Sequence, residues 1–358
     1  MLLRVTLCLL LCLTLAPLPG ASPLRVEIVH KGLVHPWGLV FLPGGDLLVS
    51  ERPGRLLRIQ ADGQRQKVSG LPEIAAQGQG GLLDLALDEQ GWLYFSYSEP
   101  GAGGSSTAVS RAKLQNNALV EVQPLFSQRP KVEGGAHFGS RLVLGSDGLL
   151  YITLGDRFNY RSQAQHLDNH LGKTIRLNRD GSLPPDNPFI HTQGALPEIW
   201  SLGHRNMQGA AWRPEVNQFW THEHGPQGGD EVNLILGGRN YGWPRVSFGE
   251  EYGGGKIGEG SSAPGLTSPL KVWVPSIAPS GMAFHSGAHY PQWRDKLFIG
   301  ALRGQSLREL TLAGDIIVGE RTLLGERGER IRTVKEGPDG ALYLLTDGAA
   351  GKLLRLIP

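Results

Sequence analysis

A strand–turn–strand unit recurs six times along this chain of 358 residues. Each copy has an apolar run, a turn rich in Gly, Asp or Pro, and a second apolar run, as in GSRLVLGSDGLLYITLGD from Gly139 and TVKEGPDGALYLLTD from Thr333. The other copies begin at Trp37, Gly81, Gly209 and Gly281. Turns such as GSDG and GPDG reverse a strand within a few residues, so each copy is at least a β-hairpin.

Further apolar segments follow several copies, for example RLLRIQADG after the first and KLLRLIP at the C-terminus. Repetition at about 45 to 70 residues, with several strands per unit, is typical of a propeller whose blades bury their faces against one another. We therefore predict an all-β fold, a six-bladed β-propeller of four-stranded antiparallel blades. Two stacked β-sandwiches are the alternative, and the number of repeats favours the propeller.

Segments at the two ends of the chain can close such a ring. Pairing residues 24–29 with residues 352–357 in the last blade would remove the exposed strand edges that an open ring leaves. Three long insertions interrupt the repeats, at residues 156–172, 179–198 and 237–279. We expect all three to form loops over one face.

The composition suits a globular β protein. The 51 glycines lack a G-X-Y period and suit tight turns, and 40% hydrophobic residues are enough for a full core. A net charge of +2, without a run of basic residues, argues against a nucleic-acid partner. No segment after the N-terminus approaches the roughly 20 apolar residues of a membrane span, so we expect none.

The N-terminus has the order of a secretory signal: Arg4, an apolar run over residues 5–16, and then PLPGAS. We assign residues 1–21 to a signal peptide and residues 22–358 to a single propeller domain, which predicts a periplasmic or secreted protein. Both cysteines, Cys8 and Cys12, lie within the signal. The mature chain therefore has no disulfide framework.

Residues 202–244 contain more candidate functional residues than any other stretch, and they include the clearest of several motifs. GGLLDLAL, HFGSRL, LGHRNMQG, HGPQGGDEVN, GGRNYGWP and IAPSGMAF occur in this order from about Gly32 to the C-terminus. This ordered set resembles the soluble aldose sugar dehydrogenases that use pyrroloquinoline quinone (PQQ), relatives of soluble glucose dehydrogenase. The resemblance implies a six-bladed propeller, PQQ at the wide central mouth, bound calcium, and oxidation of an aldose at C1 to the lactone.

The resemblance also implies catalytic roles for two residues. His137, in GAHFGSRL, matches the general base that takes the proton of the sugar hydroxyl, a task that needs a neutral imidazole within hydrogen-bond reach. Arg205 and Asn206 match a pair that contacts the quinone, where a guanidinium would stabilise the developing negative charge. Some family members place Asp directly before the catalytic His. Here that residue is Ala136, so another group must orient His137.

Further matches concern cofactor binding. PQQ carries three carboxylates, and Arg303, Arg330 and Arg332 fall at cationic family positions. Residues 330 and 332 would share one face of a strand, so a single anion could meet both side chains. Gln79 and Tyr252 match further cofactor-contacting positions.

For calcium, the family pattern falls on a Gly-Pro turn, a carboxylate and an aromatic residue: Gly225, Pro226, Glu231 and Tyr241. Backbone carbonyls and a carboxylate are the hard oxygen ligands that calcium takes.

Two other functions remain open. His222 and His224 form an H-x-H pair, which on a strand points both imidazoles to one side and suits a metal-dependent lactonase. A non-catalytic extracellular binding propeller is the other alternative, because fold alone does not exclude it. For the dehydrogenase we expect an aldose sugar as substrate. The electron acceptor would be external, a quinone, cytochrome or dye, because the sequence has no haem motif C-x-x-C-H.

Overall fold

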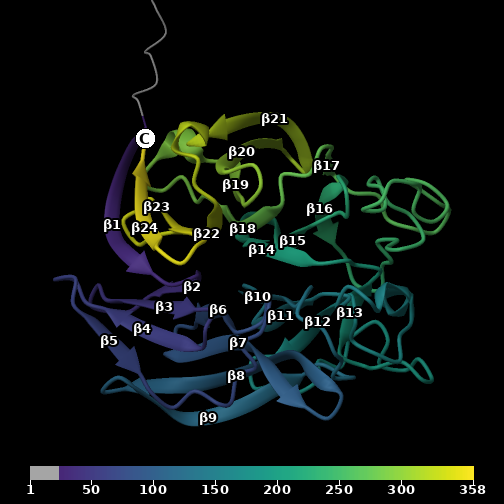
Figure 1. The fold of residues 1–358 in the computed structure, drawn as a ribbon, viewed down its shortest axis with the longest axis horizontal. Coiled ribbons are helices and arrows are strands. Elements are labelled where there is room, and N and C mark those ends of the chain that lie inside the picture. The colour runs from purple at the N-terminus through teal and green to yellow at the C-terminus, as the bar shows by residue number, and fades with distance from the viewer. Residues whose placement is uncertain (1–23) are drawn as a thin grey trace, which may run out of the picture.

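The computed structural model describes residues 24–358, which form six four-stranded antiparallel sheets around a common centre (Figure 1). In chain order we number these sheets blades 1 to 6. The predicted six-bladed propeller is confirmed, and each of the first five blades is a meander in which consecutive strands pair. The predicted signal peptide, residues 1–21, lies outside the described residues. Residues 24–358 contain no helix with the length and apolar character needed to span a membrane.

The blades have the following strands. Blade 1 comprises β2 (Pro36–Phe41), β3 (Leu47–Glu51), β4 (Arg55–Ile59) and β5 (Arg65–Val68). Blade 2 comprises β6 (Leu82–Leu87), β7 (Trp92–Gly101), β8 (Gly104–Gln115) and β9 (Ala118–Ser127). Blade 3 comprises β10 (Gly139–Leu144), β11 (Leu149–Leu154), β12 (Lys173–Asn178) and β13 (Ile199–Leu202).

The second half of the ring repeats this arrangement. Blade 4 comprises β14 (Met207–Arg213), β15 (Gln218–Glu223), β16 (Asp230–Ile235) and β17 (Lys271–Trp273). Blade 5 comprises β18 (Pro279–Phe284), β19 (Lys296–Ala301), β20 (Ser306–Ala313) and β21 (Ile316–Leu323). Blade 6 comprises β22 (Ile331–Glu336), β23 (Leu342–Thr346), β24 (Gly351–Ile357) and β1 (Arg25–Leu33). Four short 3-10 helices lie between strands: η1 (Arg161–Gln165), η2 (Pro214–Val216), η3 (Pro291–Trp293) and η4 (Gly325–Arg327).

The hairpin turns of the repeats are held by an aspartate and a tyrosine. In blade 3, Asp147 accepts a hydrogen bond from the backbone of the next strand, and Tyr151 donates its hydroxyl proton to the same carboxylate at 2.8 Å. Gly148 supplies the positive φ of +84° that this turn requires. Asp339 and Tyr343 repeat the device in blade 6 at 3.3 Å. These contacts are local, which explains why the turns could be identified from the sequence.

The hydrophobic core lies between neighbouring blades. Leu48 and Leu56 of blade 1 pack with Leu85 and Phe95 of blade 2 in one buried cluster, and similar clusters join the other blades. Each blade therefore needs its neighbours to bury its faces.

The two ends of the chain close the ring. β1 pairs antiparallel with β24, from Arg25 opposite Ile357 to Leu33 opposite Gly351, and in Figure 1 the purple β1 lies beside the yellow β24. The predicted closure is confirmed.

The first strands of all six blades surround a central channel and contact one another around the ring. These inner strands run in the same direction, so their beginnings form one mouth of the channel and their ends form the other. Polar side chains and arginines line the first mouth, which we call the polar mouth. Mostly apolar side chains line the other, the apolar mouth. Between the mouths, buried Arg141 donates hydrogen bonds to Asp84 at 3.2 Å and to the carbonyls of Gln208 and Arg332 at 2.8 and 2.9 Å.

Two of the long insertions reach the polar mouth, because residues of 156–172 and 237–279 line a cavity there. The prediction that all three insertions lie over one face is wrong for residues 179–198. Arg179 contacts Glu89 at 2.7 Å and the Gly145 carbonyl at 3.2 Å, both in turns at the apolar mouth. The insertion joins β12 to β13, the third and fourth strands of blade 3. The third strand runs in the same direction as the inner strand, so it also ends at the apolar mouth, and the insertion begins there.

Candidate functional site

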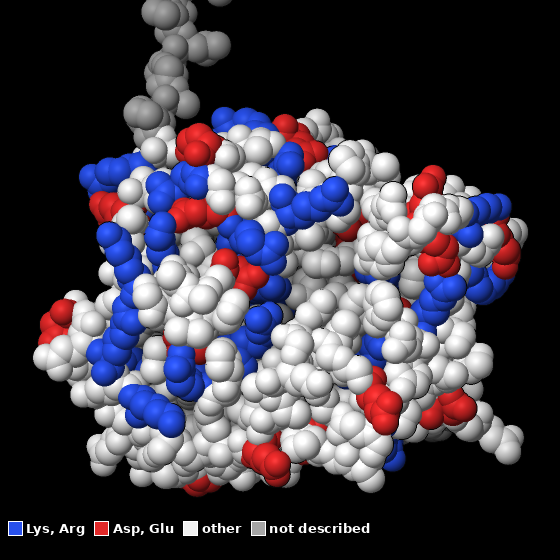
Figure 2. Space-filling model, viewed as in Figure 1, with Lys and Arg blue, Asp and Glu red and all other residues white. Residues whose placement is uncertain are grey.

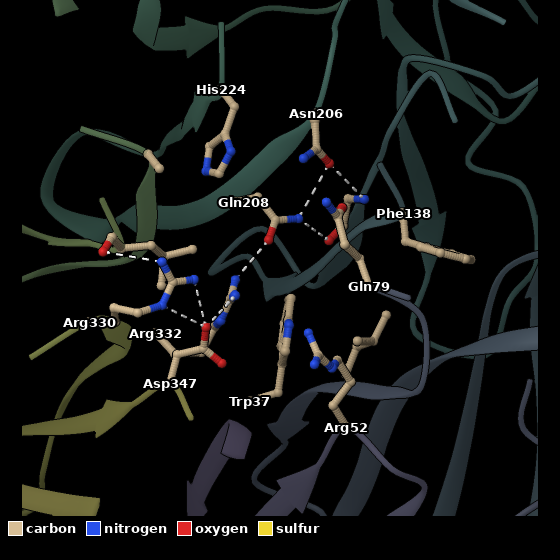
Figure 3. A pocket seen from close by; sticks show the side chains of 14 residues that line it. Trp37, Arg52, Gln79, Phe138, Asn206, Gln208, His224, Arg330, Arg332 and Asp347 are labelled. Atoms are coloured by element: carbon tan, nitrogen blue, oxygen red, sulfur yellow. Dashed lines mark hydrogen bonds and ion pairs between the residues drawn. The ribbon is translucent and has the colours of Figure 1, made fainter. Parts of the chain in front are cut away.

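A cavity of about 220 Å³ opens at the polar mouth, and every blade contributes to its wall (Figure 3). In ring order the contributing side chains include Trp37, Leu83, Phe138, Asn206, Ala278 and Arg332. Lys and Arg side chains also gather on the left part of the face seen in Figure 2, beside a hollow near its centre. We call this space the central cavity.

Four residues expected to bind the cofactor meet in the central cavity: Gln79, Asn206, Arg330 and Arg332. Arg330 and Arg332 do share an anion, as their spacing predicted, but that anion is the carboxylate of Asp347. The distances are 2.8 Å from Arg330 and 3.5 Å from Arg332. Burial would raise the pKa of Asp347, but the charges of Arg332, Arg330 and Arg52 outweigh the effect of burial and lower that pKa to about 2.

Arg303, the third predicted cationic residue, lies differently. It is exposed in the turn between β19 and β20, and its neighbour Leu302 lines the central cavity instead. The structure therefore does not bring the Arg303 side chain into the wall.

A second cavity, of about 270 Å³, adjoins the first and is lined by His137, which is buried. We call it the His137 cavity, and Arg205 and Tyr252 also line it. The two cavities share a wall. Gln79 accepts a hydrogen bond from the backbone N–H of His137 at 2.9 Å, and the consecutive residues 205 and 206 line one cavity each.

Asp156 orients the imidazole of His137. Its Oδ1 lies 2.7 Å from Nδ1 of His137, while its Oδ2 accepts a hydrogen bond from the Trp243 indole at 2.8 Å. With the proton on Nδ1, the Nε2 lone pair is available as a base. Burial lowers the pKa of His137 below its ordinary 6.5, more than Asp156 raises it, so the ring is neutral at neutral pH. Asp156 thus fills the role that Ala136 leaves open.

Backbone contacts fix this pair beside Arg205. His137 has a left-handed φ of +54°. A Cβ on Gly155 would lie 2.1 Å from the His137 carbonyl oxygen, so only glycine fits there. The Asp156 N–H donates to the Arg205 carbonyl at 2.8 Å. The segments before β10, after β11 and before β14 therefore hold one another in place.

Arg205 is buried and faces three acceptors. Its guanidinium donates to the carbonyls of His224 and Gly225 at 3.0 and 2.9 Å and to the hydroxyl of Tyr252 at 3.0 Å. The structure therefore brings Arg205 and Tyr252, two of the predicted cofactor-contacting residues, together. Both residues border the cavity that contains the candidate base.

Three of the four predicted calcium ligands, Gly225, Glu231 and Tyr241, line one small cavity. Pro226 lines the adjoining His137 cavity. Glu223 also borders the small cavity. Burial raises the pKa of Glu231 well above its ordinary range, and the negative charge of Glu223 raises it further. Two crowded carboxylates beside backbone oxygens are a donor set that fits a hard divalent cation, so the residues present suit calcium.

The H-x-H pair does not form a larger ligand cluster. His222 is fully buried against Gly209, and neither of its ring nitrogens has a hydrogen-bond partner among the described residues. His224 lines the central cavity, where Nε2 donates to the Pro279 carbonyl at 2.6 Å. Burial lowers the pKa of His224 to about 3. Within residues 24–358, no group of three or more His, Cys, Asp or Glu side chains is placed to hold a metal ion.

Asp156, Glu223 and Asp347 line the cavities of this site but were not predicted, although the repeats contain a signal for them. The second strand of a repeat ends at the polar mouth, and an acidic residue stands at or just after this end in four copies. These residues are Glu51, Asp156, Glu223 and Asp347. Comparing that position across the copies would have identified Asp156 as a residue near His137.

Known proteins resemble this chain over nearly its whole length. The Glucose / Sorbosone dehydrogenase family matches residues 33–355. The aldose sugar dehydrogenase YliI of Escherichia coli (strain K12) is 43% identical, over 98% of this chain and 97% of that protein. A crystal structure of glucose dehydrogenase is 46% identical, with a TM-score of 0.91, and covers 93% of this chain and 99% of its own. The PQQ-bound form of an aldose sugar dehydrogenase from Streptomyces coelicolor is 28% identical, with a TM-score of 0.75, over 94% and 99% of the two chains.

Proposed function

The chain belongs to the Glucose / Sorbosone dehydrogenase family, and we propose that it is a PQQ-dependent aldose sugar dehydrogenase that oxidises the C1 hydroxyl of an aldose to the lactone. The observation that carries this proposal is the His137–Asp156 pair, with the lone pair of Nε2 available in a cavity beside a second, arginine-lined cavity. A neutral base next to a site for an anionic quinone is what this oxidation requires.

The central cavity fits PQQ by its chemistry. PQQ is a planar tricarboxylate, and Arg330 and Arg332 offer it charged donors, while Gln79 and Asn206 offer neutral ones. When bound, PQQ supplies the quinone carbon that accepts the hydride from C1 of the sugar.

His137 removes the proton of the C1 hydroxyl at Nε2. Its Nδ1–H stays hydrogen-bonded to Asp156, whose negative charge stabilises the imidazolium that forms. Trp243 holds the other carboxylate oxygen, so the carboxylate cannot turn away from the ring. Arg205, fixed by two backbone carbonyls, provides positive charge at the border of the cavity where negative charge develops.

Gly225, Glu231 and Tyr241, together with the adjacent Pro226, would hold calcium beside Arg205. A cation there would offset the repulsion between Glu231 and Glu223 and keep the Gly-Pro turn in place. The electrons leave to an external acceptor. Residues 1–21 fit an export signal, so we expect the mature enzyme in the periplasm or outside the cell.

A single titration series tests this function. Apo-protein is titrated with PQQ and calcium while the absorbance of the quinone is recorded, and dye reduction is then assayed with a panel of aldoses. We expect saturable PQQ binding and sugar-dependent dye reduction. Metal-dependent lactone hydrolysis without PQQ would identify the hydrolase instead. PQQ binding without turnover on any aldose would indicate a binding propeller.

A further inference from the structure

We infer that Arg52 is an additional arginine that binds a carboxylate of the anionic cofactor in the central cavity, an inference that rests on the proposed function. Arg52 lies in the turn between β3 and β4, outside the motifs that point to the other site residues. Its side chain lines the central cavity together with Trp37 and Gln79. In Figure 3 it extends from the lower edge of the view toward the middle of the cavity.

Arg52 differs from the other two arginines of this wall in making no direct ion pair with Asp347, although its charge contributes to the low pKa of that carboxyl. Arg330 and Arg332 are both paired with Asp347, and Arg332 also donates to Gln208 at 2.9 Å. In the part of the chain that the structure describes, the guanidinium of Arg52 forms neither an ion pair nor a hydrogen bond. The wall thus holds three arginines against one carboxylate.

This excess of positive charge is unfavourable without a ligand. Burial, together with the positive charges of Arg141, Arg330 and Arg52, lowers the pKa of Arg332 to about 10 despite the attraction of Asp347. Like charges that crowd one cavity wall are stabilised when an anion enters between them. A ligand carboxylate could accept two hydrogen bonds from the guanidinium of Arg52, which makes none within the described residues. At Arg330 and Arg332 the same carboxylate would have to compete with Asp347.

Hydrogen bonds to neighbouring segments fix the backbone of Arg52. Its N–H donates to the His35 carbonyl at 3.0 Å, and its carbonyl accepts from Leu82 N–H at 3.2 Å. A Cβ at Gly81 would lie 1.8 Å from the Arg52 carbonyl oxygen, so this close approach of blades 1 and 2 requires glycine. The guanidinium therefore projects from a fixed turn, which reduces the entropy lost when it binds an anion.

The test measures binding of PQQ to apo-protein by absorbance or fluorescence titration, without any turnover. Arg52→Gln removes both the positive charge and the paired N–H donors of the guanidinium, whereas Arg52→Lys keeps the charge alone. Lys67→Gln is the control, because it removes an exposed charge on β5 of the same blade. Hydrogen bonds between charged groups predict about tenfold to hundredfold weaker PQQ binding in Arg52→Gln. We expect a smaller loss in Arg52→Lys and an unchanged Kd in Lys67→Gln.

Two further measurements separate carboxylate binding from a structural effect. The trimethyl ester of PQQ lacks the carboxylate charges, so Arg52→Gln should bind it as the parent does. The apo-form of Arg52→Gln should melt no lower than the parent, because the replaced guanidinium has no partner to lose. An equal loss of affinity for PQQ and its ester, or a lower melting temperature, would assign Arg52 a structural role and overturn the inference.

The two proposals fail in different ways. If the parent binds PQQ and Arg52→Gln has the same Kd, the inference about Arg52 is wrong while the proposed function stands. If the parent does not bind PQQ with or without calcium, the proposed function is wrong and the inference falls with it.

Discussion

At the scale of single residues, the site depends on a histidine whose two ring nitrogens are in different environments. Nδ1 of His137 faces the Asp156 carboxylate at 2.7 Å, and burial keeps the ring neutral. The same ring borders the cavity where a sugar could enter. This asymmetry fixes the tautomer, so the proposed base has its Nε2 lone pair available before a substrate binds.

Replacing His137 with Ala should abolish most sugar oxidation and leave PQQ binding intact. A positioned base contributes about 10²- to 10⁴-fold to rate, so kcat should fall within this range at full cofactor occupancy, read from absorbance. The contrasting variant is Arg205→Ala. In the parent, the Arg205 guanidinium is hydrogen-bonded to the carbonyl of Gly225, a predicted calcium ligand, so cofactor affinity and turnover should fall together in the variant. Turnover by His137→Ala within a few-fold of the parent would show that another residue is the base.

Replacing Asp156 with Asn should lower kcat by about 10²- to 10⁴-fold, because the amide no longer fixes the Nδ1–H tautomer or stabilises the imidazolium. The pH profile gives an independent reading. His137 must be unprotonated, and burial places its pKa below 6.5, so the parent should lose activity only as the pH falls below that value. Asp156 raises this pKa, so its loss should shift the acid limb to still lower pH. An unshifted limb would contradict the role of Asp156.

At the scale of elements, the strand that closes the ring holds the last blade against the first. β1 pairs with β24, and fully buried Leu33 at the end of β1 packs in a cluster with blade 1 residues such as Leu39. Blades bury their faces only against neighbours, so an open ring would expose the interface between blades 6 and 1.

Leu33→Ala should therefore destabilise the whole propeller by about 2 to 5 kcal/mol, the usual range for truncating a buried leucine. Ile28→Ala is the matched control, because Ile28 lies on the same strand and is 43% exposed. Its effect should be within about 0.5 kcal/mol, as for most exposed positions. Both variants are compared by thermal or urea unfolding at fixed calcium. Equal effects of the two substitutions would show that closure does not depend on this contact.

At the scale of the whole molecule, a bound cation should couple the site to global stability. Calcium that binds the folded chain alone stabilises it by mass action, by about 2.7 kcal/mol at a hundredfold excess over Kd. A chelator should therefore lower the melting temperature and release PQQ. An unchanged melting temperature and full activity in chelator would show that the site does not bind calcium.

Glu231→Gln provides the second half of this test. Burial and the negative charge of Glu223 both raise the pKa of Glu231, so a charged carboxylate is unfavourable there in apo-protein, and the apo variant should melt at or above the parent temperature. Calcium should then raise its melting temperature less than it raises that of the parent, because one anionic ligand is gone. An equal calcium response in both proteins would show that Glu231 is not a ligand.

The sequence by itself determined the strands, the turns and the number of blades. Each depends on neighbours along the chain: alternating apolar residues, and turns such as that of Asp147 and Gly148. It also indicated that the two ends of the chain pair. Family resemblance added His137, Arg205 and the residues around them, because those lie within recognisable motifs.

The tertiary structure alone decided which side chains meet. Asp156 reaches His137 across the hairpin of blade 3, Asp347 joins Arg330 and Arg332, and Arg52 enters the central cavity without a partner. These distances depend on how six blades pack around one axis and on which end of each strand faces the polar mouth. Neither is encoded in any short stretch: His137 and Asp156 are 19 residues apart, Arg330 and Asp347 are 17 apart, and the wall that Arg52 joins forms only when six blades pack around one axis.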